Sequence, residues 1–340
     1  MLQLLLLFAC LNAVSLQTLQ SFPKLTNVRD FDDFLRQTGK VYLDEKEREF
    51  RESIFVATKS LVDLNNRHSS SYKLSLNAFA DMTRKELSSL LGSKLSVEGE
   101  TLTKGHINFL PAPQPSDANL PESFDWREKG GVTPPGHQGS CGACWAFSAT
   151  GSLEGHLFRR TGVLVPLSQQ NLLDCSDAYG SNGCDGGFQE YGFEYIRDHG
   201  VTLANKYPYV QKALDCKRND TTTFPGDSIV KIRDYARIKA GDQQTMKQVI
   251  ATLGPLACSV NASPTSFQQY SGGIYDDEEC NKEEVNHAVV VVGYGSENGR
   301  DYWIVKNSYS ENWGEGGFFR LLSNPSNFCG IASECSYPIL

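Results

Sequence analysis

The sequence predicts an α+β fold with two lobes, because helical patterns come first and strand patterns follow. Residues 144–160 contain no proline and place apolar side chains on one helical face, whereas short runs rich in valine, isoleucine and aromatic residues dominate after about residue 229. The 340 residues are 40% hydrophobic and 21% charged, which is typical of a soluble chain with a substantial core. The interface between two such lobes is a usual place for a cleft.

Residues 1–15 predict a secretory signal. The apolar run MLQLLLLFACL precedes Ala13-Val14-Ser15, a small-x-small cleavage site, and is shorter than the roughly 20 residues that a membrane span needs. A buried N-terminal helix is the alternative interpretation. No membrane span is expected later in the chain.

Residues 16–119 predict a removable pro-segment. From about 25 to 90 the chain is charged and lacks cysteine, and the proline-rich stretch 110–116 indicates an exposed linker that a protease can reach. Apolar residues in the charged part recur at helical spacing: Phe31, Phe34, Leu35, Phe50, Ile54, Phe55, Leu61, Val62 and Leu64. Residues 120–340 then form a cysteine-containing body.

The body divides into a helical lobe, about 128–228, and a β lobe, about 229–340. Helices are expected at 144–160, 168–173 and 187–198. Strands are expected at 256–260, 288–294, 302–306 and 318–322. The net charge of −8 and the lack of a basic cluster argue against a nucleic-acid partner, because binding to phosphate backbones depends on clustered lysine and arginine.

The cysteine count points to the chemistry. Of ten cysteines, Cys10 leaves with the signal, and the odd number that remains indicates one unpaired thiol in a secreted chain. Cys144 is the candidate, because it begins the helix after a loop, where free N–H groups and the helix dipole favour a thiolate. A Cys141–Cys144 redox pair lacks a thioredoxin-like setting, and half of a zinc site lacks a second cysteine pair at ligand spacing.

A thiolate nucleophile works best beside an imidazole base. His287 stands at the start of an apolar strand in the other lobe, and Asn307 ends the next expected strand, where its amide can fix the tautomer of the ring. His137 lies too close in the loop to face the thiol. His156 and His199 follow helical surface patterns, which predict solvated side chains.

Three segments, QGSCGACWAFS, NHAVVVVGYG and WIVKNSYSENWGEGGFFRL, resemble in order and spacing the active-site blocks of papain-like cysteine proteases. Upstream, residues 77–81 resemble the second motif of cathepsin L-type propeptides, and residues 120–127 resemble a mature start. The interspersed first motif of those propeptides is matched by Glu47, Arg51, Phe55 and Asn66. The chain is identified as a cathepsin L-like member of this family.

The resemblance implies a papain-like two-lobed fold, with a helical lobe, a β-barrel-like lobe and the active-site cleft between them, preceded by a helical propeptide. It implies a cysteine endopeptidase that acts through a thioester acyl-enzyme, with Cys144 as nucleophile, His287 as general base and acid, and Asn307 as the residue that orients the ring. Gln138 would complete the oxyanion hole. No metal or organic cofactor is implied. Tyr309 departs from the pattern, since the family usually has a tryptophan there that shields the Asn–His hydrogen bond from water.

The resemblance also implies the substrate contacts. Gly186 and Gly187 belong to the wall on which the substrate backbone lies, and the pocket for the second residue before the scissile bond is lined by Phe188, Ser259 and Glu334. A carboxylate at Glu334 would pair with arginine and still leave room for an apolar side chain, and a surface glutamate is the alternative. Two further substrate-binding residues are Asn286 and Trp313.

Pairing of the remaining cysteines is open from the sequence alone. The resemblance implies the bridges Cys141–Cys184, Cys175–Cys216 and Cys280–Cys329. Cys258 and Cys335 lie outside this set and form either a fourth bridge or two buried thiols. Asn219 fits the N-glycosylation pattern.

The expected partners are protein or peptide substrates, cystatin-type inhibitors and the chain's own propeptide, which inhibits the enzyme until acid loosens it. A monomer of the secretory pathway is expected, in the lysosome or the extracellular space. The alternative function is a catalytically weak or inactive secreted homologue that acts as a binding or storage protein. A zinc hydrolase, a further class, lacks ligand spacing.

Overall fold

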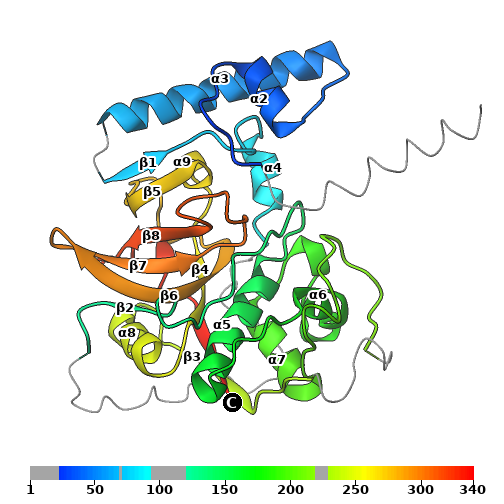
Figure 1. Ribbon diagram of the computed structural model, residues 1–340, viewed down its shortest axis with the longest axis vertical. Coiled ribbons are helices and arrows are strands. Elements are labelled where there is room, and N and C mark those ends of the chain that lie inside the picture. Colours follow the sequence, from blue (N-terminus) through cyan, green and yellow to red (C-terminus); the bar gives the residue numbers. More distant parts are fainter. Residues whose placement is uncertain (1–22, 69–70, 93–119, 219–228) are drawn as a thin grey trace, which may run out of the picture.

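The computed structural model of the chain describes residues 23–68, 71–92, 120–218 and 229–340. The predicted signal, the linker at 110–116 and Asn219 lie outside these residues. A helical pro-segment lies across one end of a body in which strands occupy one side and helices the other (Figure 1). The expected α+β class is confirmed.

The helices of the described residues are α2 (Phe31–Thr38), α3 (Glu45–His68), α4 (Arg84–Ser89), α5 (Cys144–Thr161), α6 (Gln169–Cys175), α7 (Gln189–His199), α8 (Gln243–Thr252) and α9 (Thr265–Gln268). The strands are β1 (Tyr72–Leu74), β2 (Phe124–Asp125), β3 (Asp234–Arg237), β4 (Leu256–Val260), β5 (Tyr270–Tyr275), β6 (His287–Glu297), β7 (Arg300–Lys306), β8 (Phe318–Leu322) and β9 (Cys335–Ile339). Short 3₁₀ turns are η1 (Asp177–Tyr179), η2 (Gly183–Asp185) and η4 (Phe328–Gly330). Every helix and strand expected within the body is present, with ends within three residues of those expected.

The sheet has the order β1-β5-β8-β7-β6-β4-β9-β3, with β2 paired to β6. Strand β6 is buried on both faces for most of its length, which explains why its apolar run is continuous rather than alternating. Strand β1 belongs to the pro-segment and pairs antiparallel with β5, so the pro-segment adds a strand to the sheet of the body. The described lobes have separate cores, one within the sheet and one around α5, α6 and α7.

The pro-segment has a small core of its own, centred on Phe31, Phe34 and Phe55. Arg51 joins α3 to α4, because its guanidinium donates hydrogen bonds to Glu47 and Glu86 at 2.6 and 2.5 Å. Two of the apolar residues that recur at helical spacing lie on the exposed side of α3: Phe50 is 49% exposed and Leu64 is 53% exposed. The buried face of α3 is narrow, consisting of Phe55, Thr58 and Val62, since the helix covers the body from outside.

Candidate active site

Cys144 is the first residue of α5 and is a free, fully buried thiol. Ala143 supplies no side-chain cap to the helix, so the first N–H groups of α5 are left for the site. The loop before the helix is fixed by the Cys141–Cys184 disulfide. This is the helix N-terminal placement that the sequence predicts.

His287 and Asn307 meet because of the way in which two strands begin and end. His287 is the first residue of β6, Asn307 directly follows β7, and the two strands are antiparallel neighbours. The Nε2 atom of His287 lies 2.8 Å from Oδ1 of Asn307, which also accepts a hydrogen bond from the backbone N–H of Ser308 at 2.8 Å. The Nδ1 atom of His287 is buried and makes no hydrogen bond within the described chain, so it is available to another partner.

The thiol lies beside the start of β6, which carries this imidazole, across the boundary between the lobes. The backbone of Ala288, the neighbour of His287, interacts with the Cys144 sulfur, and so does the backbone of Gly92 in the pro-segment. Cys144 belongs to the helical lobe and His287 to the β lobe, so the two chemical groups are brought together only when the lobes pack.

Tyr309 covers the histidine. Its ring stacks on that of His287, with centroids 4.9 Å apart and the planes 29° apart, and it is 1% exposed. Trp313 meets Tyr309 edge-on at 5.6 Å, and Phe79 of the pro-segment meets it from outside at 5.3 Å. The phenol therefore occupies the shielding position, and its hydroxyl is buried without a hydrogen bond within the described chain.

Replacing Tyr309 by tryptophan is expected to raise turnover by about two- to fivefold and to shift the pH–rate curve, because an indole covers more of the His287–Asn307 hydrogen bond and leaves no unpaired hydroxyl in the cluster. The pH dependence of kcat/KM on a dipeptidyl substrate measures this. Tyr309→Phe is the matched control, since it removes the hydroxyl without adding area. If both curves overlay that of the wild type, shielding by this residue has no effect on catalysis.

Gln138 is fully buried, and its amide group faces the pro-segment. Nε2 donates hydrogen bonds to the carbonyl oxygens of Leu90 and Cys141, at 2.8 and 2.9 Å, and Oε1 accepts one from the Ser308 hydroxyl at 2.5 Å. The carbonyl of Leu90 thus binds the Gln138 side-chain N–H group, a donor of the kind that stabilises an oxyanion.

The pro-segment also occupies the expected substrate wall. The backbone N–H of Gly187 donates to the carbonyl of Gly92 at 2.8 Å. A Cβ added to Gly92 would lie 1.8 Å from the carbonyl oxygen of Gly142, and a Cβ added to Gly186 would lie 2.3 Å from the carbonyl oxygen of Gly92. The two backbones can approach this closely because glycine has no side chain.

This cover changes the proton affinities of the two reactive groups. Burial raises the pKa of the Cys144 thiol above its ordinary value, although backbone groups of Ala288 and Gly92 offset part of the rise. Burial lowers the pKa of His287 to about 4, against a smaller raising effect of the hydrogen bond with Asn307. Both groups are therefore neutral at pH 7 beneath the pro-segment, whereas the sequence alone predicts a thiolate at the helix start.

Two of the three predicted specificity residues, Ser259 and Glu334, come together where β4 and β9 meet. The backbone N–H of Ser259 donates to the carbonyl of Glu334 at 3.1 Å, and Phe188 lies just before α7. Glu334 is 8% exposed, so it is not a surface glutamate. Asn286 uses its side chain within its own lobe: Oδ1 accepts from the backbone N–H of Ala262 at 2.9 Å, and Nδ2 donates to the Ser263 hydroxyl at 2.6 Å.

Trp313 is buried in an aromatic cluster that also contains Phe267, Tyr270 and Phe319. Its Nε1 donates to the carbonyl of Gln268 at 3.0 Å. The indole is therefore held in place beneath Tyr309 rather than free to rotate.

The structure contains four disulfides. Three are those implied by the resemblance, Cys141–Cys184, Cys175–Cys216 and Cys280–Cys329, and the fourth joins Cys258 to Cys335, the pair that the sequence left open. Within the described chain Cys144 is then the one free cysteine, in agreement with the odd count.

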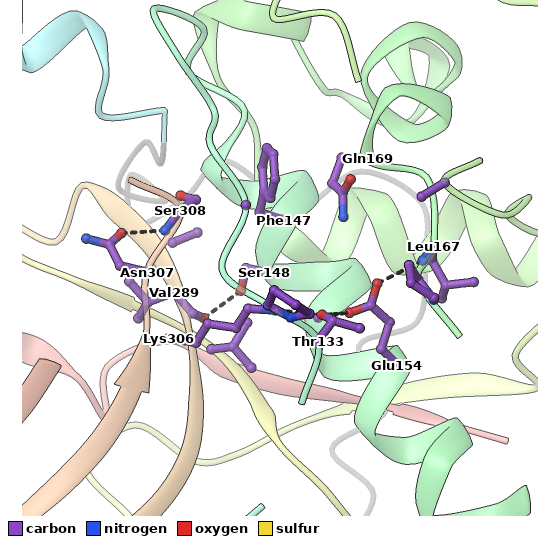
Figure 2. Close-up of a pocket in the computed structure, with 17 residues that line it drawn as sticks. Thr133, Phe147, Ser148, Glu154, Leu167, Gln169, Val289, Lys306, Asn307 and Ser308 are labelled. Atoms are coloured by element: carbon purple, nitrogen blue, oxygen red, sulfur yellow. Dashed lines mark hydrogen bonds between the residues drawn. The ribbon is translucent and has the colours of Figure 1, made fainter. Parts of the chain in front are cut away.

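One polar connection between the lobes was not predicted. The Thr133 hydroxyl donates to Glu154 of α5 at 2.6 Å and accepts from the Lys306 ammonium at 2.7 Å (Figure 2). These groups line a cavity of about 190 Å³, and Asn307 and Ser308 also line it. In the sequence, the only local sign of this connection is a glutamate among small residues on a helix. It does not reveal that Thr133 binds Lys306, which lies 173 residues later in the chain.

The prediction for His156 is wrong. The side chain is 6% exposed, and its Nε2 lies 3.2 Å from the carbonyl oxygen of Pro255, which comes from the loop before β4. Burial lowers its pKa to about 4.

His199 is half-buried on the last turn of α7, with a distance of 5.2 Å between the centroids of its ring and that of Tyr195. The backbone of His137 pairs with that of Tyr309.

Within the residues that the structure describes, no group of three or more histidine, cysteine, aspartate or glutamate side chains is arranged to hold a metal ion. None of the described helices has both the length and the apolar character to cross a membrane.

Comparison with known proteins agrees with this site. A family profile described as papain family cysteine protease matches residues 120–339, and one described as cathepsin propeptide inhibitor domain (I29) matches residues 31–87. The chain is 39% identical to a cathepsin L-like peptidase of Aedes aegypti, over 98% of this chain and 97% of that protein, and 41% identical to cathepsin L of Sarcophaga peregrina, over 89% and 90%.

Among solved structures, the digestive procathepsin L 3 of Tenebrio molitor larval midgut superimposes with a TM-score of 0.78 at 36% identity, covering 91% of this chain and 97% of that chain. Both a propeptide and a catalytic body are therefore matched, in the same order. The chain belongs to the papain family of cysteine proteases and is a cathepsin L-like cysteine endopeptidase made as a zymogen.

Proposed function

We propose that Cys144, His287, Asn307 and Gln138 carry out the peptide-bond hydrolysis of this endopeptidase. The observation that carries the proposal is the His287–Asn307 hydrogen bond at the boundary between the lobes, beside a buried free thiol. Asn307 holds Nε2, so Nδ1 is the atom that accepts the thiol proton. The thiolate then attacks the substrate carbonyl carbon, and the resulting oxyanion faces the amide of Gln138 and the N–H of Cys144.

Collapse of this intermediate breaks the C–N bond, and the imidazolium returns its proton to the leaving amine. The thioester that remains is hydrolysed by a water from which His287 takes a proton, and Cys144 leaves as the thiol. Labelling with an epoxide thiol inhibitor tests the assignment. After propeptide removal we expect one inhibitor per chain on Cys144 and complete loss of hydrolysis, whereas labelling elsewhere with full inhibition would contradict it.

The propeptide, about residues 16–119, is proposed to act as the intramolecular inhibitor of the mature body, 120–340, because Leu90 and Gly92 cover the site. The proposed destination is the lysosome or the extracellular space, with protein or peptide substrates and cystatin-type inhibitors as partners of a monomer.

Release of the propeptide is expected to accelerate as the pH falls from about 6.5 to about 4. His287 has a pKa of about 4 while covered and recovers an ordinary value near 6.5 once exposed to water, so the uncovered state binds more protons in this interval. Acid therefore favours the uncovered state. The rate of propeptide loss at pH 7, 5.5 and 4 measures this, and Cys144→Ala is the control. If that variant matures as fast in isolation, cleavage is not performed by the enzyme itself.

Glu334 is proposed to let the pocket accept arginine as well as apolar side chains. Replacing Glu334 by alanine is expected to lower kcat/KM for an Arg-Arg dipeptidyl substrate by about tenfold, because a buried charge pair is lost, and to leave the value for Phe-Arg within about twofold. The ratio of the two substrates is the measurement. An unchanged ratio would remove this role from Glu334.

A further inference from the structure

We propose that Ser148 is a positioning residue, whose hydroxyl holds the Cys144 thiol in register with the His287 imidazole. The proposal rests on the proposed function, since it assumes that these two groups react as a pair. Ser148 is buried on α5, in the helical lobe. Its hydroxyl donates a hydrogen bond of 2.7 Å to the backbone carbonyl of Val289 in β6, in the other lobe (Figure 2).

The first step is the place of this hydrogen bond relative to the reacting groups. Ser148 follows Cys144 by four residues, so the two side chains lie on one face of α5, about 6 Å apart along the helix axis. Val289 follows His287 by two residues, which is about 7 Å along a strand. The hydrogen bond therefore lies one step behind the thiol on the helix and one step behind the imidazole on the strand.

The second step is the contact between α5 and β6 on both sides of this hydrogen bond. On one side, the backbone of Ala288 interacts with the Cys144 sulfur. On the other side, a Cβ added to Gly151 would lie 2.9 Å from Cγ2 of Val290. Successive contact residues of the helix thus meet successive residues of the strand. A shift of α5 along β6 would displace the thiol, and the directional bond of Ser148 opposes such a shift.

The third step is the choice of partner by the Ser148 hydroxyl. Serine and threonine hydroxyls inside helices often bond to a carbonyl of the preceding turn. Thr150 does so, since its hydroxyl donates to the carbonyl of Ala146 at 2.9 Å. Ser148 instead bonds across the boundary between the lobes, where both it and Val289 line the cavity of about 190 Å³. Alanine at this position would remove the donor from the Val289 carbonyl beside a space into which the helix can move.

The test compares Ser148→Ala with the wild type, both activated by an added protease and both normalised by active-site titration with an epoxide thiol inhibitor. We expect kcat for Phe-Arg to fall by about tenfold with KM within about twofold. The reason is that displacement of a reacting group by a fraction of an ångström slows the chemical step, whereas the binding pockets are unchanged.

A second measurement is the rate at which iodoacetamide alkylates Cys144 at pH 5. An ordinary thiol has a pKa of about 8.5 and is almost entirely protonated at this pH. Because the thiolate is the nucleophile, the rate reports the thiolate that the imidazole maintains. This rate should also fall by about tenfold in Ser148→Ala, although no substrate pocket takes part in the reaction.

Ser152→Ala is the matched control. Ser152 is also a buried serine of α5, and its hydroxyl donates to a carbonyl of the β lobe, that of Pro255, at 2.8 Å. It lies about one turn farther from Cys144, and its acceptor precedes β4 instead of belonging to β6. This variant should lower the melting temperature as much as Ser148→Ala does and keep kcat and the alkylation rate within about twofold.

Ser148→Thr is the conservative variant. It keeps the hydroxyl, and its added methyl group has space in the cavity that Ser148 lines. We expect it to recover kcat and the alkylation rate to within about threefold of the wild type.

If Ser148→Ala keeps the wild-type kcat and alkylation rate, the proposal is overturned. Equal losses in Ser148→Ala and Ser152→Ala, or no recovery in Ser148→Thr, would assign the effect to general packing of the lobes and would also overturn it. The same holds if Ser148→Ala yields no titratable site, because the bond then serves folding. A failure of the proposed function would show in the wild type itself, where iodoacetamide would inhibit by labelling a residue other than Cys144, and the role of Ser148 would fail with it.

Discussion

Replacing His287 by alanine is expected to lower kcat/KM of the activated enzyme by about 10³-fold or more, the range typical of a lost general acid–base group that also activates a nucleophile. The Nε2 atom of the imidazole is fixed by Asn307 at 2.8 Å, and the backbone of the next residue, Ala288, contacts the buried thiol. Without it the Cys144 thiol has no base to take its proton, and the leaving amine has no acid. The measurement is kcat/KM on Phe-Arg after propeptide removal by an added protease.

His156→Gln is the matched control for this variant. His156 is also a buried histidine whose pKa burial lowers to about 4, but it lies farther along α5 and contacts the Pro255 carbonyl instead of the thiol. Its replacement is expected to lower the free energy of unfolding by about 1–2 kcal/mol and to leave kcat/KM within about twofold. Equal losses in the two variants would mean that the effect of His287 is one of folding rather than of proton transfer.

The catalytic candidates could be found from the sequence because each stands at the boundary of a strongly patterned element. Cys144 begins a helix without proline, His287 begins a strand that contains four consecutive valines, and Asn307 directly follows a strand. A helix start or a strand end is a local property of the chain, and the antiparallel pairing of two consecutive strands then brings His287 and Asn307 together.

The residues that sequence reasoning missed depend on distant segments. His156 looks like a surface histidine on its own helix and is buried only because the carbonyl of Pro255, 99 residues later, lies against it. Thr133, Glu154 and Lys306 come from three segments that meet only when the lobes pack. The pairing of β1 with β5 likewise requires the pro-segment to be in place, and its three residues carry no strand signal long enough to detect.

The contacts that keep the zymogen inactive also depend on the packing of distant segments. Leu90 and Gly92 contact Gln138 and Gly187 through their backbones, so their side chains give no sequence signal for the contact. The close approach of the two backbones requires that residue 92 has no side chain. A single methyl group there tests the inhibitory contact without touching the catalytic residues.

Replacing Gly92 by alanine is expected to raise the rate at which Cys144 of the full-length chain reacts with an epoxide inhibitor at pH 7 by about 100-fold, equivalent to about 2.7 kcal/mol of lost propeptide contact. The added Cβ would lie 1.8 Å from the carbonyl oxygen and 2.5 Å from the carbonyl carbon of Gly142, and backbone atoms cannot move aside as a flexible side chain can. The segment must therefore leave the wall at Gly187, which uncovers the thiol and restores the pKa of His287 towards its ordinary value.

Gly39→Ala supplies the matched control, because it adds the same methyl group to the same pro-segment. Gly39 caps α2 with a φ of 72°, and its added Cβ would meet nothing within 4 Å, so only the left-handed backbone is strained, by about 1 kcal/mol. This variant should label at nearly the wild-type rate. If Gly39→Ala and Gly92→Ala label equally fast, inhibition depends on the overall stability of the propeptide. If Gly92→Ala stays as slow as the wild type, the backbone contact at Gly187 does not hold the site closed, and the contacts of α3, α4 and β1 must be sufficient by themselves.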